Sequence, residues 1–427
     1  MPPIEDHPLR YQVANELHAR PFPVLQAPSR AVFLALKPAQ KAAERDRGAD
    51  FDHLLDLLDR HGAPHPPAGA THYFGQIGKH QLKWESHTEF VTYTIFGDGV
   101  ADTPFDARTY QMFPADWLDR APGTRITSAL IRVERQDGDD GIAEKLEKWF
   151  VPESLAVSRV IDDDAVIAGD FRIDEAGHQR FAVFVREATG RRRTGRIVQR
   201  LCEIETYKTM SMLGFARART LGPTMSAIDK RLNALTDGLT GETNGVETTL
   251  HALLQVSGEL EQLSAQSAFR FGATEAYEKI VNQRIQVLRE ARFHGRQTFA
   301  EFMMRRFDPA MRTVASTKAR LDAMSARALR AADLLRTRVD VDRSRENKQL
   351  LESMDRRADL QLRLQRTVEG LSVVAISYYA VNLALYLLGP LGDGLDLDKG
   401  VQAALVTPPV LLGVWLLVRR IRKKMDH

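Results

Sequence analysis

The sequence predicts an α+β (or α/β) cytosolic domain, then a helical stalk, and then a C-terminal two-helix transmembrane hairpin. Segments rich in β-branched and aromatic residues concentrate in residues 1–221. Residues 222–367 lose this character and carry leucine, methionine and alanine at helical spacing, and two uncharged apolar runs follow at 370–392 and 400–418. Because 427 residues exceed one ordinary core, we expect separate structural units.

The composition is that of an ordinary soluble surface for most of the chain. The formal net charge is +3, and 27% of the residues are charged. The single cysteine, Cys202, excludes an intrachain disulfide and leaves too few thiolates for a zinc finger, which favours a reducing compartment. The first residues have no basic stretch followed by an apolar one, so they do not resemble a secretory signal. We therefore expect the N-terminal domain in the cytoplasm.

The N-terminal domain, residues 1–221, mixes helices and strands without a visible repeat. Its β-branched and aromatic segments predict strands at 30–37, 87–96, 125–134, 154–161, 165–171 and 180–185. Helices are predicted at 7–20, 51–61, 141–150 and 195–218, with a proline-rich loop at 61–70. The last three strands are close in sequence, which favours an antiparallel meander.

Histidines and carboxylates gather around the second of these strands. The group comprises His72, His80, His87, Glu85 and Glu89, with Glu16 and His18 upstream. Such side chains ligate zinc or serve hydrolases, but no pair has the HExxH spacing. Strand alternation places Glu85, His87 and Glu89 on one face, where some of these groups are simply solvated. We interpret the group as structural and retain His72, His80 and His87 as candidate metal ligands.

Other catalytic signatures are missing from the sequence. It has no P-loop, no Rossmann glycine fingerprint and no GxSxG elbow, so we predict no catalytic and no cofactor-binding residues. The basic run GRRRTGR, residues 190–196, is of a kind that contacts nucleic acid or anionic lipid. No aromatic residues interleave with it, so we interpret it as a solvated turn before a helix that begins near Thr194, and we expect no nucleic-acid partner.

The helical stalk, residues 222–367, carries a coiled-coil-like seam in its last part. Breaks are predicted at 237–245, near Gly272 and near Gly295, and the final helix is expected to begin at Asp308 and Pro309. Along that helix an apolar residue recurs every seven positions, at Val314, Leu321, Ala328 and Leu335. Two alternatives explain the seam, namely packing against the preceding helices of the same chain or self-association. Residues 340–349 are almost all polar, so we expect them to be solvated.

The two apolar runs predict membrane spans at 370–389 and 400–418. At about 1.5 Å per residue, each crosses a hydrocarbon core of about 30 Å. Arginines precede the first span, and a basic tail at 419–427 follows the second, whereas the connecting loop has only Lys399. This asymmetry predicts cytoplasmic N- and C-termini.

The connecting loop holds Asp393, Asp396 and Asp398, which would lie on the far side of the membrane. Their spacing does not match an EF-hand, and a solvated turn explains them in a single copy. In a ring of identical chains the same loops would form rings of carboxylates that concentrate cations. The three aspartates are therefore candidate ligands for a divalent cation, together with Asn382 and Tyr378 in the first span.

Five stretches together resemble one family: HPLRYQVANELHARPFP, KWESHTEFVTYT, RLCEIETYKTMSMLG, RFGATEAY and LLESMDRRADLQLRLQRTVEGLSVVAISYY. They are similar to the proteobacterial membrane-anchored proteins grouped as domain of unknown function 3422. The resemblance covers essentially the whole chain and implies a two-span protein of the bacterial inner membrane. It implies no activity and no catalytic residues.

The layout is also similar to that of the CorA-type magnesium channels, which join a cytosolic α/β domain through a long helix to two spans. Those channels carry a Gly-Met-Asn motif at the outer end of the first span, where this chain has Gly389, Pro390 and Leu391. We therefore predict a non-enzymatic, membrane-anchored homo-oligomeric scaffold or regulator, with the lipid bilayer as a partner. The alternative is a CorA-like divalent cation channel with an altered filter, and a metal-dependent enzyme comes third.

Overall fold

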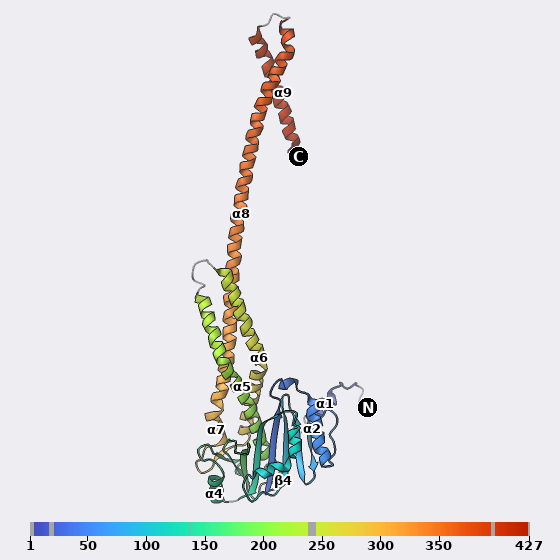
Figure 1. Ribbon diagram of the computed structural model, residues 1–427, viewed down its shortest axis with the longest axis vertical. Helices are drawn as coiled ribbons and strands as arrows, with labels where there is room; N and C mark the ends of the chain where they lie inside the picture. Colours follow the sequence, from blue (N-terminus) through green and yellow to red (C-terminus); the bar gives the residue numbers. More distant parts are fainter. Residues whose placement is uncertain (1–3, 17–20, 137, 238–244, 394–397, 426–427) are drawn as a thin grey trace. The chain divides into compact units, whose positions relative to one another are not determined.

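The computed structural model describes residues 4–16, 21–136, 138–237, 245–393 and 398–425, and it divides into two compact units. The first unit comprises Met1–Glu242 and His251–Ala331, and the second comprises Thr243–Leu250 and Ala332–His427. Figure 1 shows the sheet of the first unit and the long helices of both. Helix α5 (Arg191–Asp237) runs without interruption through the predicted boundary at 221 and 222.

In the described part of the first unit, nine strands form one mixed sheet in the order β2-β3-β4-β1-β5-β8-β7-β6-β9. Neighbouring strands are antiparallel except β5 and β8, which are parallel. The strands are β1 (Ser29–Lys37), β2 (His72–Ile77), β3 (His80–Ser86), β4 (Val91–Asp98), β5 (Thr124–Arg135), β6 (Ala156–Val160), β7 (Ala165–Gly169), β8 (Gln179–Val185) and β9 (Ala291–Arg292). The predicted meander of the last three strands is confirmed, as β6-β7-β8.

Helices cover both faces of this sheet. On one face Ala31, Phe33 and Ala35 of β1 pack in a core with α5, the end of α6 (Val246–Gln286), α7 (Phe299–Arg306) and the start of α8 (Asp308–Asp393). On the other face Val32 and Leu34 pack with α2 (Arg47–Arg60) and α3 (Ala115–Asp119), while α4 (Asp139–Trp149) covers β6, β7 and β8. Because successive strand residues point to opposite faces, covering both faces explains why β1 is apolar almost throughout.

Three long helices of the first unit pack against one another beyond the sheet. An ion pair links each pair of helices: Arg231 with Glu259 (α5 and α6), Asp229 with Arg320 and Arg327 (α5 and α8), and Lys318 with Glu275 (α6 and α8). Val314, Leu321 and Ala328 of the predicted seam are at most 5% exposed within the single chain. The seam in this unit is therefore occupied by helices of the same chain, which is the intrachain alternative of the sequence analysis.

The mixed α+β character and the long helices are confirmed, but several predicted bounds are wrong. Residues 87–90 connect β3 to β4 and are not the start of a strand, and the hairpin of β2 and β3 was not among the predicted strands. Helix α6 passes straight through Gly272, so the predicted break there is wrong. The break near Gly295 is confirmed, because residues 287–298 form a connection that includes β9.

The second unit is helical in its described residues. It contains the start of α6, the part of α8 from Ala332 onward, and α9 (Lys399–Met425). An ion pair between Arg343 of α8 and Glu247 of α6 links the first two. No residue of the polar segment at 340–349 is buried, as predicted for a solvated segment, and its one apolar side chain, Val341, is 46% exposed. Two helical segments, Phe299–Leu388 and Lys399–Ile421, each contain a stretch long and apolar enough to span a membrane, and almost none of those side chains is buried inside the chain.

Candidate functional site

A cavity of about 220 Å³ lies between the sheet and helix α5 in the first unit. Strands β1, β3 and β4 supply one wall, α5 supplies the other, and α6 and two connecting segments complete the rim. The lining residues are Phe33, Lys83, Glu85, Thr92, Thr94 and Phe96 from the sheet, Gln199, Cys202, Glu203, Thr206 and Tyr207 from α5, Arg284 from α6, and Phe22 and His87 from connections. The cavity therefore joins segments far apart in the sequence.

The strand register places the polar lining residues side by side. Thr94 pairs with Phe33 on one side and with Lys83 on the other, and Thr92 pairs with Glu85. Their neighbours along the strands, such as Trp84 and Tyr93, point to the opposite face and pack beneath α2. The alternation visible in KWES and VTYT thus marks one apolar and one polar face. The cavity is not evident from the sequence, because such a polar face is ordinarily solvated, whereas here α5 covers it.

Two ion pairs face the cavity. On the sheet wall, Lys83 Nζ lies 3.3 Å from Glu85 Oε2, with side chains 5% and 16% exposed. On the helical wall, Arg284 donates through Nε to the Glu203 carboxylate, which also accepts a 2.8 Å hydrogen bond from Gln199 Nε2. Burial raises the pKa of the Cys202 thiol, so this cysteine stays protonated at neutral pH. The cavity is therefore polar and charge-balanced, without an activated thiolate.

Glu89 belongs to a separate buried cluster and is not the solvated group that strand alternation indicated. It is 0% exposed, Arg270 donates to both of its carboxylate oxygens, and the Tyr277 hydroxyl donates at 3.0 Å. Lys37 Nζ lies 3.9 Å from it, and burial lowers the pKa of Lys37. This cluster joins the β3–β4 connection to α6, and its hydrogen bonds fully engage the carboxylate.

The structure does not bring the three candidate histidines together. His72 pairs with Glu85 at one end of the β2–β3 hairpin, His80 pairs with Ile77 at the other end, and only His87 reaches the cavity. Burial lowers the pKa of His80, which favours its neutral form. His18 and the Glu16 side chain lie outside the described residues. Within the described part of the chain, no three His, Cys, Asp or Glu side chains are arranged to hold a metal ion.

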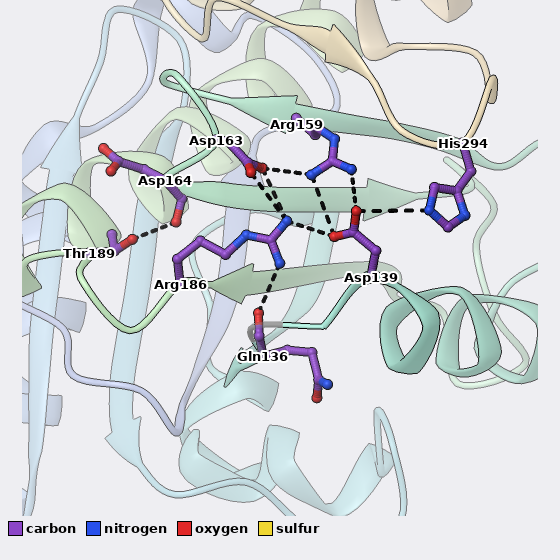
Figure 2. Close-up of polar contacts among 8 residues, drawn as sticks. All are labelled: Gln136, Asp139, Arg159, Asp163, Asp164, Arg186, Thr189 and His294. Atoms are coloured by element: carbon purple, nitrogen blue, oxygen red, sulfur yellow. Dashed lines mark hydrogen bonds and ion pairs between the residues drawn. The ribbon is translucent and has the colours of Figure 1, made fainter.

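A second charged cluster surrounds the turn between β6 and β7. Figure 2 shows Arg159 and Arg186 bridging Asp139 and Asp163. His294 Nε2 lies 3.8 Å from Asp139 Oδ2. The backbone of Ile161, Asp162 and Asp163 is left-handed, with φ between 52° and 69°, which a β-branched residue such as isoleucine rarely adopts. The surrounding arginines neutralise the aspartates of this turn and hold the strained backbone.

The basic run at 190–196 begins a helix and does not form the predicted turn. Helix α5 starts at Arg191, Arg193 pairs with Asp164 at 2.5 Å, and Thr194 and Gly195 are buried. A Cβ on Gly195 would lie 1.8 Å from the carbonyl oxygen of Pro23, so only glycine lets this loop approach the helix. That approach positions the neighbouring Phe22 at the cavity rim.

The candidate cation ligands of the C-terminal hairpin are described only in part. Asp396 and the side chain of Asp393 lie outside the described residues. The Asp398 carbonyl accepts hydrogen bonds from the backbone amides of Val401 and Gln402, so this residue begins the first turn of α9. Asn382 is partly buried in α8, where Tyr378 is 67% exposed. The helix start explains Asp398 without an ion.

These features define a class of protein in which an α+β sheet domain is followed by long helices and by two helical stretches of membrane-spanning length. The chain belongs to the family described as protein of unknown function (DUF3422), which it matches over residues 5–425. No curated protein and no solved structure matches the chain.

Proposed function

We propose that the protein is a membrane-anchored scaffold or regulator of the bacterial inner membrane that acts without catalysis. The supporting observation is the C-terminal pair of apolar helical stretches, whose side chains the chain itself leaves uncovered. In water such surfaces cost roughly 25 cal/mol per Å² of exposed apolar area, and a bilayer removes that cost. The basic residues that flank both stretches favour cytoplasmic N- and C-termini.

Self-association through the second unit is part of this proposal. Because helices of the same chain occupy the seam from Val314 to Ala328, a homo-oligomer needs another apolar surface. Helix α8 offers one before the predicted span, where four exposed apolar side chains lie along one side of the helix: Leu350, Leu351, Met354 and Leu362. Burying such side chains between copies is favourable by about 1.5–3 kcal/mol for each one fully buried.

Deletion of residues 367–427 tests the anchor. The shortened chain lacks both apolar stretches, so it should leave the membrane fraction without detergent, whereas the full chain should require detergent. The matched control deletes only the basic tail at 419–427 and should stay in the membrane fraction. Persistent membrane association of the shortened chain would contradict the proposed anchor.

Flux measurements distinguish the scaffold from the alternative cation channel. The full-length protein in proteoliposomes should show no saturable divalent-cation flux. If flux is found, and if replacing Asp393, Asp396 and Asp398 together with asparagine reduces it, the scaffold assignment is wrong and the CorA-like channel is favoured.

A further inference from the structure

The cavity beneath α5 contains buried polar atoms that the protein leaves without hydrogen bonds. Among the described residues, Lys83 Nζ and Gln199 Oε1 are each buried and have no hydrogen-bond partner, although Lys83 lies beside Glu85. The two residues lie on opposite walls, one on β3 and the other on α5. A buried polar group without a hydrogen bond costs about 1–3 kcal/mol. Gln199 Oε1 lacks one, and Lys83 has only its ion pair with Glu85, so the site favours a ligand that supplies a donor to the first and an acceptor to the second.

The two atoms require opposite partners. An ammonium only donates hydrogen bonds, so Lys83 needs an acceptor such as a carboxylate oxygen. An amide oxygen only accepts, so Gln199 needs a donor such as an ammonium or hydroxyl group. The ligand therefore carries an acceptor near the sheet and a donor near the helix.

The charges of the lining residues restrict the ligand further. Two cations, Lys83 and Arg284, balance two carboxylates, Glu85 and Glu203. A ligand with a net charge would leave one charge uncompensated in a partly buried space, which is costly. A ligand with one positive and one negative group keeps the balance and can approach an ion pair on each wall.

Size and the aromatic lining residues complete the description. The cavity of about 220 Å³ is smaller than the roughly 300–1,000 Å³ typical of sites for drug-sized molecules, so its ligand is a small metabolite. Phe22, Phe33 and Phe96 supply apolar surface beside the charged groups. A small molecule with a charged end and an apolar end matches such a lining.

We infer that this cavity binds a small zwitterionic metabolite of the amino acid class. Lys83 binds its carboxylate, Gln199 and the neighbouring Glu203 bind its ammonium group, and the phenylalanines contact its side chain. The inference is independent of the proposed membrane anchor, because every lining residue belongs to the first unit. It adds a ligand-binding role to the N-terminal domain, for which the sequence offered only three histidines as candidate metal ligands.

The test measures binding of the proteinogenic L-amino acids to the full-length protein in detergent by isothermal titration calorimetry. At least one should bind saturably, with a dissociation constant between about 1 μM and 1 mM, the range of the usual KM values of enzymes. The amine and the carboxylic acid that each lack one charged group of that amino acid should bind at least about tenfold more weakly.

Two substitutions locate the binding, and one serves as a control. Lys83→Met removes the ammonium and should weaken binding by about tenfold or more. Cys202→Leu extends a larger side chain from the cavity wall and should weaken binding without removing a charge. Lys145→Met removes a lysine that is paired with Glu134 away from the cavity and should leave binding unchanged.

Several outcomes would overturn the inference. Absence of binding by every amino acid to the folded full-length protein would do so, as would equally tight binding of the carboxylic acid analogue. Unchanged affinity in Cys202→Leu would place the ligand elsewhere, and this variant decides the matter if Lys83→Met does not fold. Equal weakening by Lys145→Met would show a general effect on the fold and would also contradict the assignment.

Discussion

Replacing Glu89 with glutamine removes the charge at the centre of the cluster that joins the β3–β4 connection to helix α6. The side chain keeps its size, but the new amide group points N–H donors at a site occupied by the donors of Arg270 and Tyr277. The Arg270 side chain, which is only 16% exposed, then lacks the Glu89 carboxylate that neutralises its charge. We expect the first unit to lose stability for this reason.

The expected loss is about 3 kcal/mol. Removing one partner of a buried ion pair costs about 3–5 kcal/mol, and the partial exposure of Arg270 places the effect at the lower end. The first unit spans about 320 residues. At an unfolding entropy of about 2.1 cal/mol/K per residue, each kcal/mol lowers the melting temperature of such a unit by about 1.5 °C, so we expect a decrease of roughly 4–5 °C.

Tryptophan fluorescence during heating measures this change, because Trp84 and Trp117 are at most 1% exposed and lie in the sheet domain. The matched control is Glu259→Gln, which breaks the exposed pair with Arg231, worth at most about 1 kcal/mol. A decrease for Glu89→Gln no larger than that of the control would refute the reasoning that burial makes the Glu89 cluster important for stability.

Two further predictions concern the contacts between the long helices. Gly214→Ala places a Cβ 2.1 Å from Thr274 Oγ1, so it should destabilise the contact of α5 with α6 by about 1–3 kcal/mol, measured by thermal unfolding. The control is Gly222→Ala, whose Cβ meets nothing within 4 Å and should not destabilise this contact. Asp229→Asn should destabilise the contact of α5 with α8 by about 1 kcal/mol at pH 7, with exposed Asp322→Asn as the control. Hydrogen bonds from Arg320 and Arg327 lower the pKa of Asp229, so its contribution is present above the ordinary value of 3.8 and is lost as the pH falls through the lowered pKa. Melting temperatures of Asp229→Asn and the unmodified protein should therefore converge in acid, and a constant difference would contradict this prediction.

Local patterns predicted most of the regular elements. The strands later seen as β1, β5, β7 and β8 are runs of β-branched and aromatic residues, and helical periodicity marked α2, α4 and the long helices. The hairpin of β2 and β3 was missed because HYFGQIGKHQLKWES mixes histidine, glycine and lysine with its apolar residues, so its strand propensity is weak. Its pairing with β4 compensates for that weakness, and this pairing is a tertiary effect.

The cavity was predictable only in fragments. Lys83, Glu85 and His87 are close neighbours in the sequence, but Gln199 and Arg284 join them only after α5 and α6 pack on the sheet. A sequence shows that a strand face is polar, whereas it does not show whether a helix or water covers that face. The pairing of Glu89 with Arg270 across 181 residues was hidden for the same reason.

The last strand has a consequence for how the chain is made. β9 pairs with the outer edge of β6, and the Ser158 hydroxyl donates to Glu290, which lies 132 residues further along. During synthesis β6 therefore remains an open edge until both α5 and α6 have left the ribosome, and open edges are sites of aggregation. The sheet is complete only when β9, which follows α5 and α6 in the chain, pairs with β6. A nascent chain that stalls within α6 therefore leaves the edge of β6 unpaired and exposed.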